Sequence, residues 1–164
     1  MTTHAMHAYP RSSELSRWLI VGAISGAVAV LVFHQPVVEL FRALGLTARH
    51  AYSTHPTNPW GVPQVWSLAF WGAVWGVLLA VALARLEGWA LLLGALVFGA
   101  IFPSLVAWFV VLPLKGHPMA GGFAPAGMAL GLVANGAWGL GTGIGLRLFG
   151  HPAQRPGTSA PRAP

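Results

Sequence analysis

The sequence contains no cysteine and no aspartate among its 164 residues. Without cysteine, the chain forms no disulfide, holds no thiolate-bound metal and has no thiol nucleophile. Without aspartate, a catalytic histidine lacks its usual orienting carboxylate, and phosphoryl transfer lacks its ordinary acidic metal ligands. The acidic residues are Glu14, Glu39 and Glu87. These absences argue against catalysis, and we expect the protein not to be an enzyme.

Charged residues of either sign are also scarce. They make up 7% of the chain, whereas soluble domains contain about 25%. The net charge of +6 comes from nine lysines and arginines scattered over tails and loops. They form no basic stripe interleaved with polar residues that read bases. We therefore expect neither a water-soluble globule nor a nucleic-acid partner.

Long apolar runs occupy most of the chain instead. A spanning helix needs roughly 20 predominantly apolar residues, and four runs meet this requirement. The sequence predicts an all-α, four-helix transmembrane bundle with antiparallel up-down topology. The predicted parts are a flexible tail at 1–13, a transmembrane domain at 14–149 with spans at about 17–40, 65–86, 89–112 and 123–149 and an outer loop at 41–64, and a disordered tail at 150–164.

The distribution of basic residues predicts the orientation of these spans. With four spans, both tails and the loop between the second and third spans share one side. That side holds Arg11, Arg17, Arg85, Arg147, Arg155 and Arg162, and the other holds Arg42, Arg49 and Lys115. Basic residues favour the cytoplasmic side. We expect a multi-pass protein of the inner (cytoplasmic) membrane with both termini in the cytoplasm.

Glycines recur four residues apart within the predicted spans. This spacing places them on one helix face and lets helix backbones approach closely. We predict helix packing through Gly22, Gly26, Gly72, Gly76, Gly127, Gly131, Gly139 and Gly143. The last span has more glycines than one neighbouring helix requires, so a dimerisation face on that span is the alternative.

Tryptophans mark the predicted membrane edges. Amphipathic rings settle at such edges, where Trp18, Trp60, Trp66, Trp89 and Trp108 fall. The deeper tryptophans are Trp71, Trp75 and Trp138, and we expect these to pack between helices.

Polar residues at membrane depth are the candidate ligand contacts. Pro36 breaks the first helix just after His34 and Gln35, and such a break frees backbone carbonyls that can line a polar pocket. We predict a small-molecule site beneath the outer loop, with tryptophans as its apolar wall. Its candidate residues are His34, Gln35, Glu39, Trp60, Trp66 and Asn135. The alternatives are structural: hydrated side chains at a helix end for His34 and Gln35, and an interhelical hydrogen bond for Asn135.

No histidine within the predicted spans has a partner histidine four residues away, so we expect no metal and no cofactor. The expected function is that of an accessory or structural membrane protein, which acts through helix–helix contacts in the lipid bilayer. Its partner would be a second copy of the chain or another membrane protein. The alternative is a small-solute facilitator or pore subunit that acts as a homo-oligomer.

Several short segments carry a resemblance to a known group. They are Trp60-Gly61-Val62-Pro63, Ser67-Leu68-Ala69-Phe70-Trp71-Gly72, Pro113-Leu114-Lys115-Gly116 and Asn135-Gly136-Ala137-Trp138-Gly139. The chain resembles small bacterial four-span membrane proteins over about residues 18–149. The resemblance implies a bacterial cytoplasmic membrane and assigns no residue roles.

Overall fold

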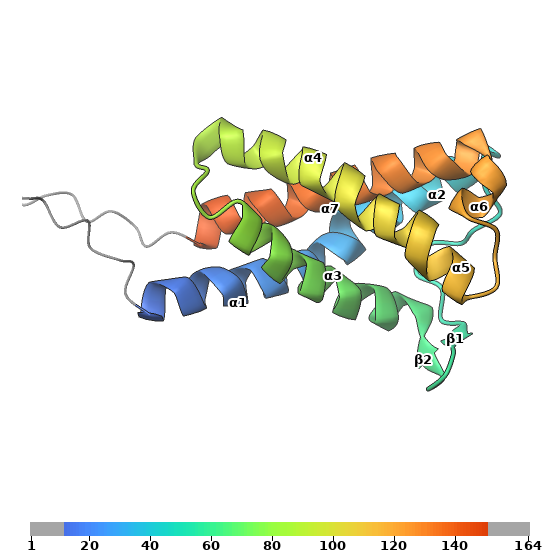
Figure 1. Cartoon of the computed structure of the whole chain (residues 1–164), viewed down its shortest axis with the longest axis horizontal. Coiled ribbons are helices and arrows are strands. Elements are labelled where there is room, and N and C mark those ends of the chain that lie inside the picture. Colours follow the sequence, from blue (N-terminus) through green and yellow to red (C-terminus); the bar gives the residue numbers. More distant parts are fainter. Residues whose placement is uncertain (1–11, 151–164) are drawn as a thin grey trace, which may run out of the picture.

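The structure is a computed structural model that describes residues 12–150. Its four long helical runs, long and apolar enough to cross a membrane, are Glu14–Ala43, Gln64–Ala82, Gly88–Leu114 and Pro125–Phe149. They lie side by side as the rods of one bundle (Figure 1). The described chain is all-α apart from one pair of two-residue strands. The tails predicted at 1–13 and 150–164 lie, except for residues 12, 13 and 150, outside the described residues.

The first rod contains a π turn that a proline explains. The rod consists of α1 (Ser12–Ala29), the π turn η1 (Val30–His34) and α2 (Gln35–Ala43). A proline ring clashes with the carbonyl four residues earlier and offers no N–H group. Just before Pro36 the helix widens, and the N–H of Gln35 bonds to the carbonyl of Val30, five residues back. The break predicted at Pro36 is therefore a π turn inside a continuous rod.

The third rod repeats this arrangement. It consists of α4 (Gly88–Val106), the π turn η2 (Ala107–Val111) and α5 (Leu112–Leu114). Pro113 follows the end of η2 at the spacing at which Pro36 follows η1. The N–H of Leu112 bonds to the carbonyl of Ala107, again five residues back. The same steric cause therefore produces a wide turn in two different rods.

The remaining elements define the two ends of the bundle. They are β1 (Pro56–Thr57), β2 (Val62–Pro63), α3 (Gln64–Ala82), α6 (Ala120–Phe123) and α7 (Pro125–Phe149). The turn end, at the left of Figure 1, carries the α3–α4 connection and both ends of the described chain. The strand end, at the right, carries β1, β2 and α6. β1 and β2 pair antiparallel, with Thr57 opposite Val62, within the segment predicted as an irregular loop.

Helix α7 is the central rod. It packs along α4 on one side and along α1 on the other, while α1 also packs along α3. Helices α3 and α4 follow each other in the chain but hardly contact each other. The backbones of α3 and α4 are therefore far apart over most of their length, and the Trp75 ring of α3 packs edge-on against Phe98 of α4 between them.

Glycines form the contact between α1 and α3. A Cβ atom added to Gly26 would lie 3.0 Å from Cα of Gly76, and one added to Gly76 would lie 3.1 Å from Cα of Gly26. A Cβ on Gly22 would lie 2.8 Å from the carbonyl oxygen of Gly76, and Gly72 meets the carbonyl of Gly26 in the same way. These two backbones approach as closely as glycine permits.

The glycines of α7 serve two neighbouring helices. Toward α4, a Cβ on Gly139 would lie 2.9 Å from Cα of Gly99, and Gly143 faces Ala95. Toward the first rod, Gly141 faces the ring of Phe33, and Gly145 faces Ser25. Contacts within the chain therefore account for this surplus of glycine. Of the other predicted packing glycines, Gly131 lies against the ring of Trp108, and Gly127 faces open space.

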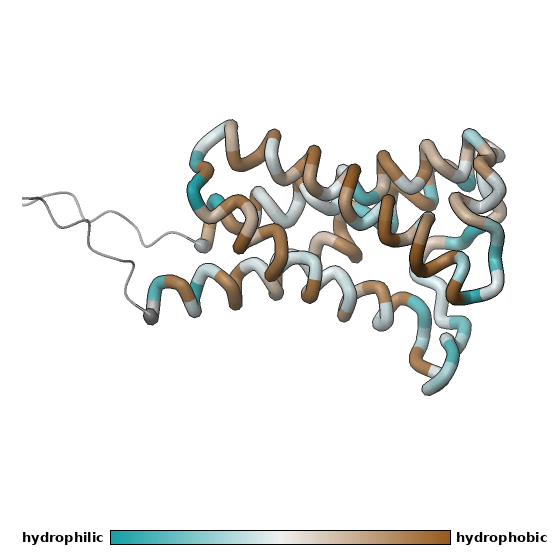
Figure 2. The backbone as a smooth tube through the Cα atoms, viewed as in Figure 1, coloured by the Kyte–Doolittle hydropathy of each residue, from teal (hydrophilic) through white to brown (hydrophobic). Residues whose placement is uncertain are grey.

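The rods are apolar on their outer faces as well as between them. Figure 2 shows hydrophobic residues along the rods and hydrophilic ones mainly at the two ends. Large apolar side chains such as Ile24, Leu93 and Val133 are about half exposed. In lipid these faces cost nothing to expose, which fits four helices long and apolar enough to cross a membrane.

Candidate functional site

The gap between α3 and the third rod contains a cavity of about 810 Å³, which we call the lateral cleft. Helix α3 forms one wall with Ser67 and Trp71, and the third rod forms the other with Pro103 and Ala107. Residues of η1 and α7 form the floor. Both π turns thus contribute to the lining. Known small-molecule sites occupy about 300–1,000 Å³, so this cleft has the size of a ligand site.

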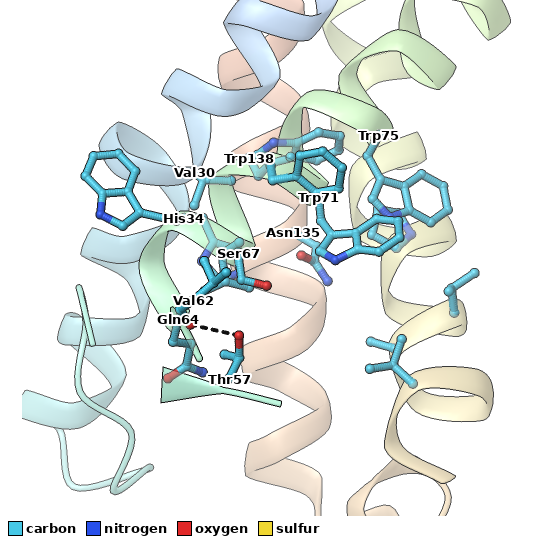
Figure 3. Close-up of a pocket in the computed structure, with 18 of the residues that line it drawn as sticks. Val30, His34, Thr57, Val62, Gln64, Ser67, Trp71, Trp75, Asn135 and Trp138 are labelled. Carbon is cyan, nitrogen blue, oxygen red and sulfur yellow. Dashed lines mark hydrogen bonds between the residues drawn. The ribbon is translucent and has the colours of Figure 1, made fainter. Parts of the chain in front are cut away.

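One end of the lateral cleft is aromatic. Figure 3 shows Trp71, Trp75 and Trp138 gathered there. Trp138 is buried and donates from its indole N–H to the carbonyl of Gly26, at 2.8 Å. The sequence predicts that Trp71 packs between helices, but this residue is 56% exposed and lines the open cleft instead. The apolar faces of these rings are suited to contact with hydrocarbon.

The other end of the lateral cleft is polar. Thr57 and Gln64 lie there beside the strands (Figure 3). The Thr57 hydroxyl donates to the carbonyl of Val62 at 2.8 Å, which ties the strand pair together. Lys115 lies at the same end and is exposed. This end of the cleft therefore adds polar groups to a lining that also includes the apolar Val62 and Leu114.

Asn135 joins the floor of the lateral cleft to its wall. Its side-chain amide donates to the hydroxyl of Ser104 on α4 at 3.0 Å, and Ser104 is 1% exposed. The predicted interhelical hydrogen bond is thus present, although Asn135 also lines the cleft. One residue fills both of the roles that the sequence offered as alternatives.

The structure brings four of the six predicted site residues to one cavity. His34, Trp60, Trp66 and Asn135 all line the lateral cleft. Gln35 is 3% exposed and points elsewhere: its side-chain oxygen accepts the N–H of Tyr52 at 2.8 Å. Glu39 lies outside the cleft and forms an ion pair with Arg42, one helical turn away.

The backbone carbonyl that Pro36 leaves without its helical partner does not face the lateral cleft as a free polar group. Pro36 has no N–H for the carbonyl of Leu31, five residues earlier, which a continuing π turn would pair with it. The Tyr52 hydroxyl donates to that carbonyl at 2.8 Å. This carbonyl is therefore already hydrogen-bonded by Tyr52, from the loop between α2 and β1.

Sequence reasoning missed most of the lining. Gln64, Ser67, Trp71, Trp75 and Lys115 line the lateral cleft, and none of them is among the site residues that the sequence predicts. Ser67, Trp71 and Trp75 recur at intervals of four, which places them on one face of α3. That spacing was a usable signal, although nothing in the sequence indicated that α4 would leave this face uncovered.

A second, polar cavity of about 660 Å³ lies next to the first. It is bounded by the β1–β2 region on one side and by the segment after α5 on the other, through His55 and His117. We call it the polar cavity. It shares five lining residues with the lateral cleft: Thr57, Asn58, Gln64, Leu114 and Lys115. The two cavities therefore meet at the strand end.

The two cavities are lined by apolar, amide, hydroxyl, imidazole and ammonium side chains. Among the described residues, no three histidine or acidic side chains gather as a metal site would require. Neither cavity has a carboxylate in its lining. Comparisons with protein-family models, curated proteins and solved structures found no match. The function must therefore be argued from the site.

Proposed function

We propose that this protein is a multi-pass membrane protein that binds one apolar or amphiphilic molecule taken from the bilayer. The observation that carries the proposal is the lateral cleft, an aromatic-walled cavity of about 810 Å³ between two helices that hardly contact each other. An apolar chain can enter sideways from the surrounding lipid. Trp71 and Trp75 would then face hydrocarbon in the bound and the empty state alike.

The orientation that we propose places the strand end outside and both termini in the cytoplasm, in an antiparallel four-span arrangement. Arg17, Arg85 and Arg147 lie near the turn end and support it. The proposed membrane is the bacterial cytoplasmic membrane, as the resemblance implies. The lateral cleft and the polar cavity then open toward the outer leaflet.

Binding is better supported than conduction by a single copy. The turn end of the bundle is closed by Leu79, Leu91 and Leu146, each 0% exposed. The polar lining of the cleft is confined to Asn135 and residues nearer the strand end. A solute that entered from the strand end would meet this apolar packing.

An accessory role through helix faces is weaker than it was from the sequence. The glycine surplus that suggested a partner face is taken up inside the chain by the first rod and α4. Gly127 is the predicted packing glycine that has open space around it. A partner role would be compatible with the lipid-binding proposal, but it has less support.

Retention of lipid tests the proposal. The protein would be placed in phosphatidylcholine nanodiscs, extracted into mild detergent and examined by native mass spectrometry. We expect one lipid to stay bound to the wild type. Ala107→Trp places a large ring in the cleft wall and should abolish this retention. Ala90→Trp is the control, because Ala90 is exposed on the same rod and lines neither cavity.

Either of two results would contradict the proposal. A wild type that retains no lipid, or an Ala107→Trp variant that retains as much as Ala90→Trp, would show that the lateral cleft does not hold the molecule. Thermal unfolding of both variants checks that each has folded.

A further inference from the structure

We propose that the bound molecule is an anionic lipid whose acyl chain lies in the lateral cleft and whose headgroup lies in the polar cavity. This inference rests on the proposed lipid binding and adds the class of lipid and its direction. The first observation is continuity. An apolar cavity and a polar one share five lining residues, so one amphiphile can occupy both.

The second observation is charge. The polar cavity is lined by Lys115, His55 and His117, and no carboxylate lines either cavity. Within the described residues Lys115 forms no ion pair, and the Glu39 carboxylate is already paired with Arg42. An exposed ammonium group without a protein counter-ion complements the phosphodiester of an anionic headgroup.

The third observation concerns two side-chain amides that can donate hydrogen bonds to a ligand. The side-chain amides of Asn58 and Gln64 line both cavities and make no hydrogen bond within the described chain. They lie where the apolar and polar parts of the site meet. Amide N–H groups at that level suit the ester and phosphate oxygens that join an acyl chain to its headgroup.

The fourth observation is that both walls of the polar cavity are held in place. The N–H of Gln64 donates to the carbonyl of His55 at 2.9 Å, which fixes the strand pair to the start of α3. Opposite, the N–H of Lys115 donates to the carbonyl of Val111 at 3.1 Å at the end of the third rod. The cationic and amide groups are thus presented by ordered backbone, which lowers the entropic cost of binding.

A competition between lipids tests the inference. The wild type would be placed in nanodiscs of equal parts phosphatidylcholine and phosphatidylglycerol, then extracted, and the retained lipid identified by mass spectrometry. We expect phosphatidylglycerol to exceed phosphatidylcholine by about fivefold, as one cation near an anionic headgroup supplies. Lys115→Gln should still retain a lipid but without this preference.

Two further variants separate charge at this site from charge in general. Lys115→Arg keeps the cation and should keep the preference. Arg49→Gln removes an exposed cation of the outer loop that lines neither cavity, and the preference should persist. Loss of the preference in Lys115→Arg, or an equal loss in Arg49→Gln, would overturn the inference.

The remaining outcomes distinguish the inference from the proposed function. Equal retention of both lipids by the wild type would overturn the anionic assignment and leave lipid binding standing. Retention of neither lipid would overturn both. Excess inorganic phosphate should not displace the lipid, because the acyl chain supplies most of the contact. Displacement by phosphate would assign the polar cavity to a free anion and overturn the inference.

Discussion

Asn135 lines the lateral cleft and also links two rods. Its amide donates to Ser104 at 3.0 Å, between α7 and α4. A hydrogen bond of this kind inside a membrane protein stabilises by only about 0.6 kcal/mol on average. The bond therefore orients Asn135 more than it holds the bundle together, and the close glycine contacts nearby supply the packing.

A double-mutant cycle measures this bond. We expect Asn135→Ala and Ser104→Ala to be coupled by about 0.6 kcal/mol in the free energy of unfolding, because either change alone removes the same interaction. Unfolding in mixed micelles gives the four values needed.

The control cycle pairs Asn135→Ala with Thr142→Ala. Thr142 is fully buried, but its hydroxyl donates to the carbonyl of Trp138 within the same helix and shares no bond with Asn135. Its coupling should be near zero. Equal coupling in both cycles would mean that the Asn135–Ser104 bond is not what is being measured.

At the scale of the elements, the glycine contacts and the π turns affect helix packing in opposite ways. The glycine contacts hold α3 against α1, and α4 against α7. The π turns widen the first and third rods next to the lateral cleft, since Val30, His34, Ala107 and Val111 line it. The same bundle therefore combines backbones in close contact at the glycines with wider turns beside the lateral cleft.

Two alanine substitutions test the close contact of α1 with α3. We expect Gly76→Ala to lower the free energy of unfolding by about 1–3 kcal/mol, because its Cβ would overlap the Gly22 carbonyl and lie 3.1 Å from Cα of Gly26. Gly127→Ala is the matched control. Nothing lies within 4 Å of its Cβ position, so stability should stay unchanged or rise by up to about 1 kcal/mol. Similar losses in both variants would argue against the contact.

At the scale of the whole molecule, the bundle has two unlike ends. The turn end is closed by apolar packing, whereas the strand end carries the polar cavity and the adjoining end of the lateral cleft. In the proposed orientation the strand end lies in the outer leaflet, so the cavities would take up lipid from that leaflet alone.

Cysteine labelling tests the orientation, since the chain has no cysteine of its own. We expect a membrane-impermeant maleimide to label Thr54→Cys, in the outer loop, on intact cells. Ala84→Cys, in the α3–α4 turn, should react only after the membrane is permeabilised. Both positions are exposed, so accessibility from each side is the variable. The reverse pattern would invert the orientation and place the cavities in the cytoplasmic leaflet.

The four helical rods follow from the amino-acid sequence alone. A long apolar segment in lipid can satisfy its backbone hydrogen bonds only by coiling into a helix, so the hydrophobic runs sufficed. The sequence also indicated where helix backbones touch, because glycines four residues apart lie on one helix face. Gly26 on α1 and Gly76 on α3 each belong to such a pair, and they face each other. The proline at position 36 marked the irregular turn.

Which polar groups share a cavity depends on how the helices pack. In a soluble protein the polar face of a helix points outward, but here both faces of each rod are apolar, so the pattern does not reveal which face is inward. The π turn adds a residue to the first rod, which rotates everything after it by about 100°. Gln35 therefore meets the N–H of Tyr52 while His34 faces the cleft. Lys115 joins Trp71 at the site because α4 packs on α7 and leaves α3 uncovered.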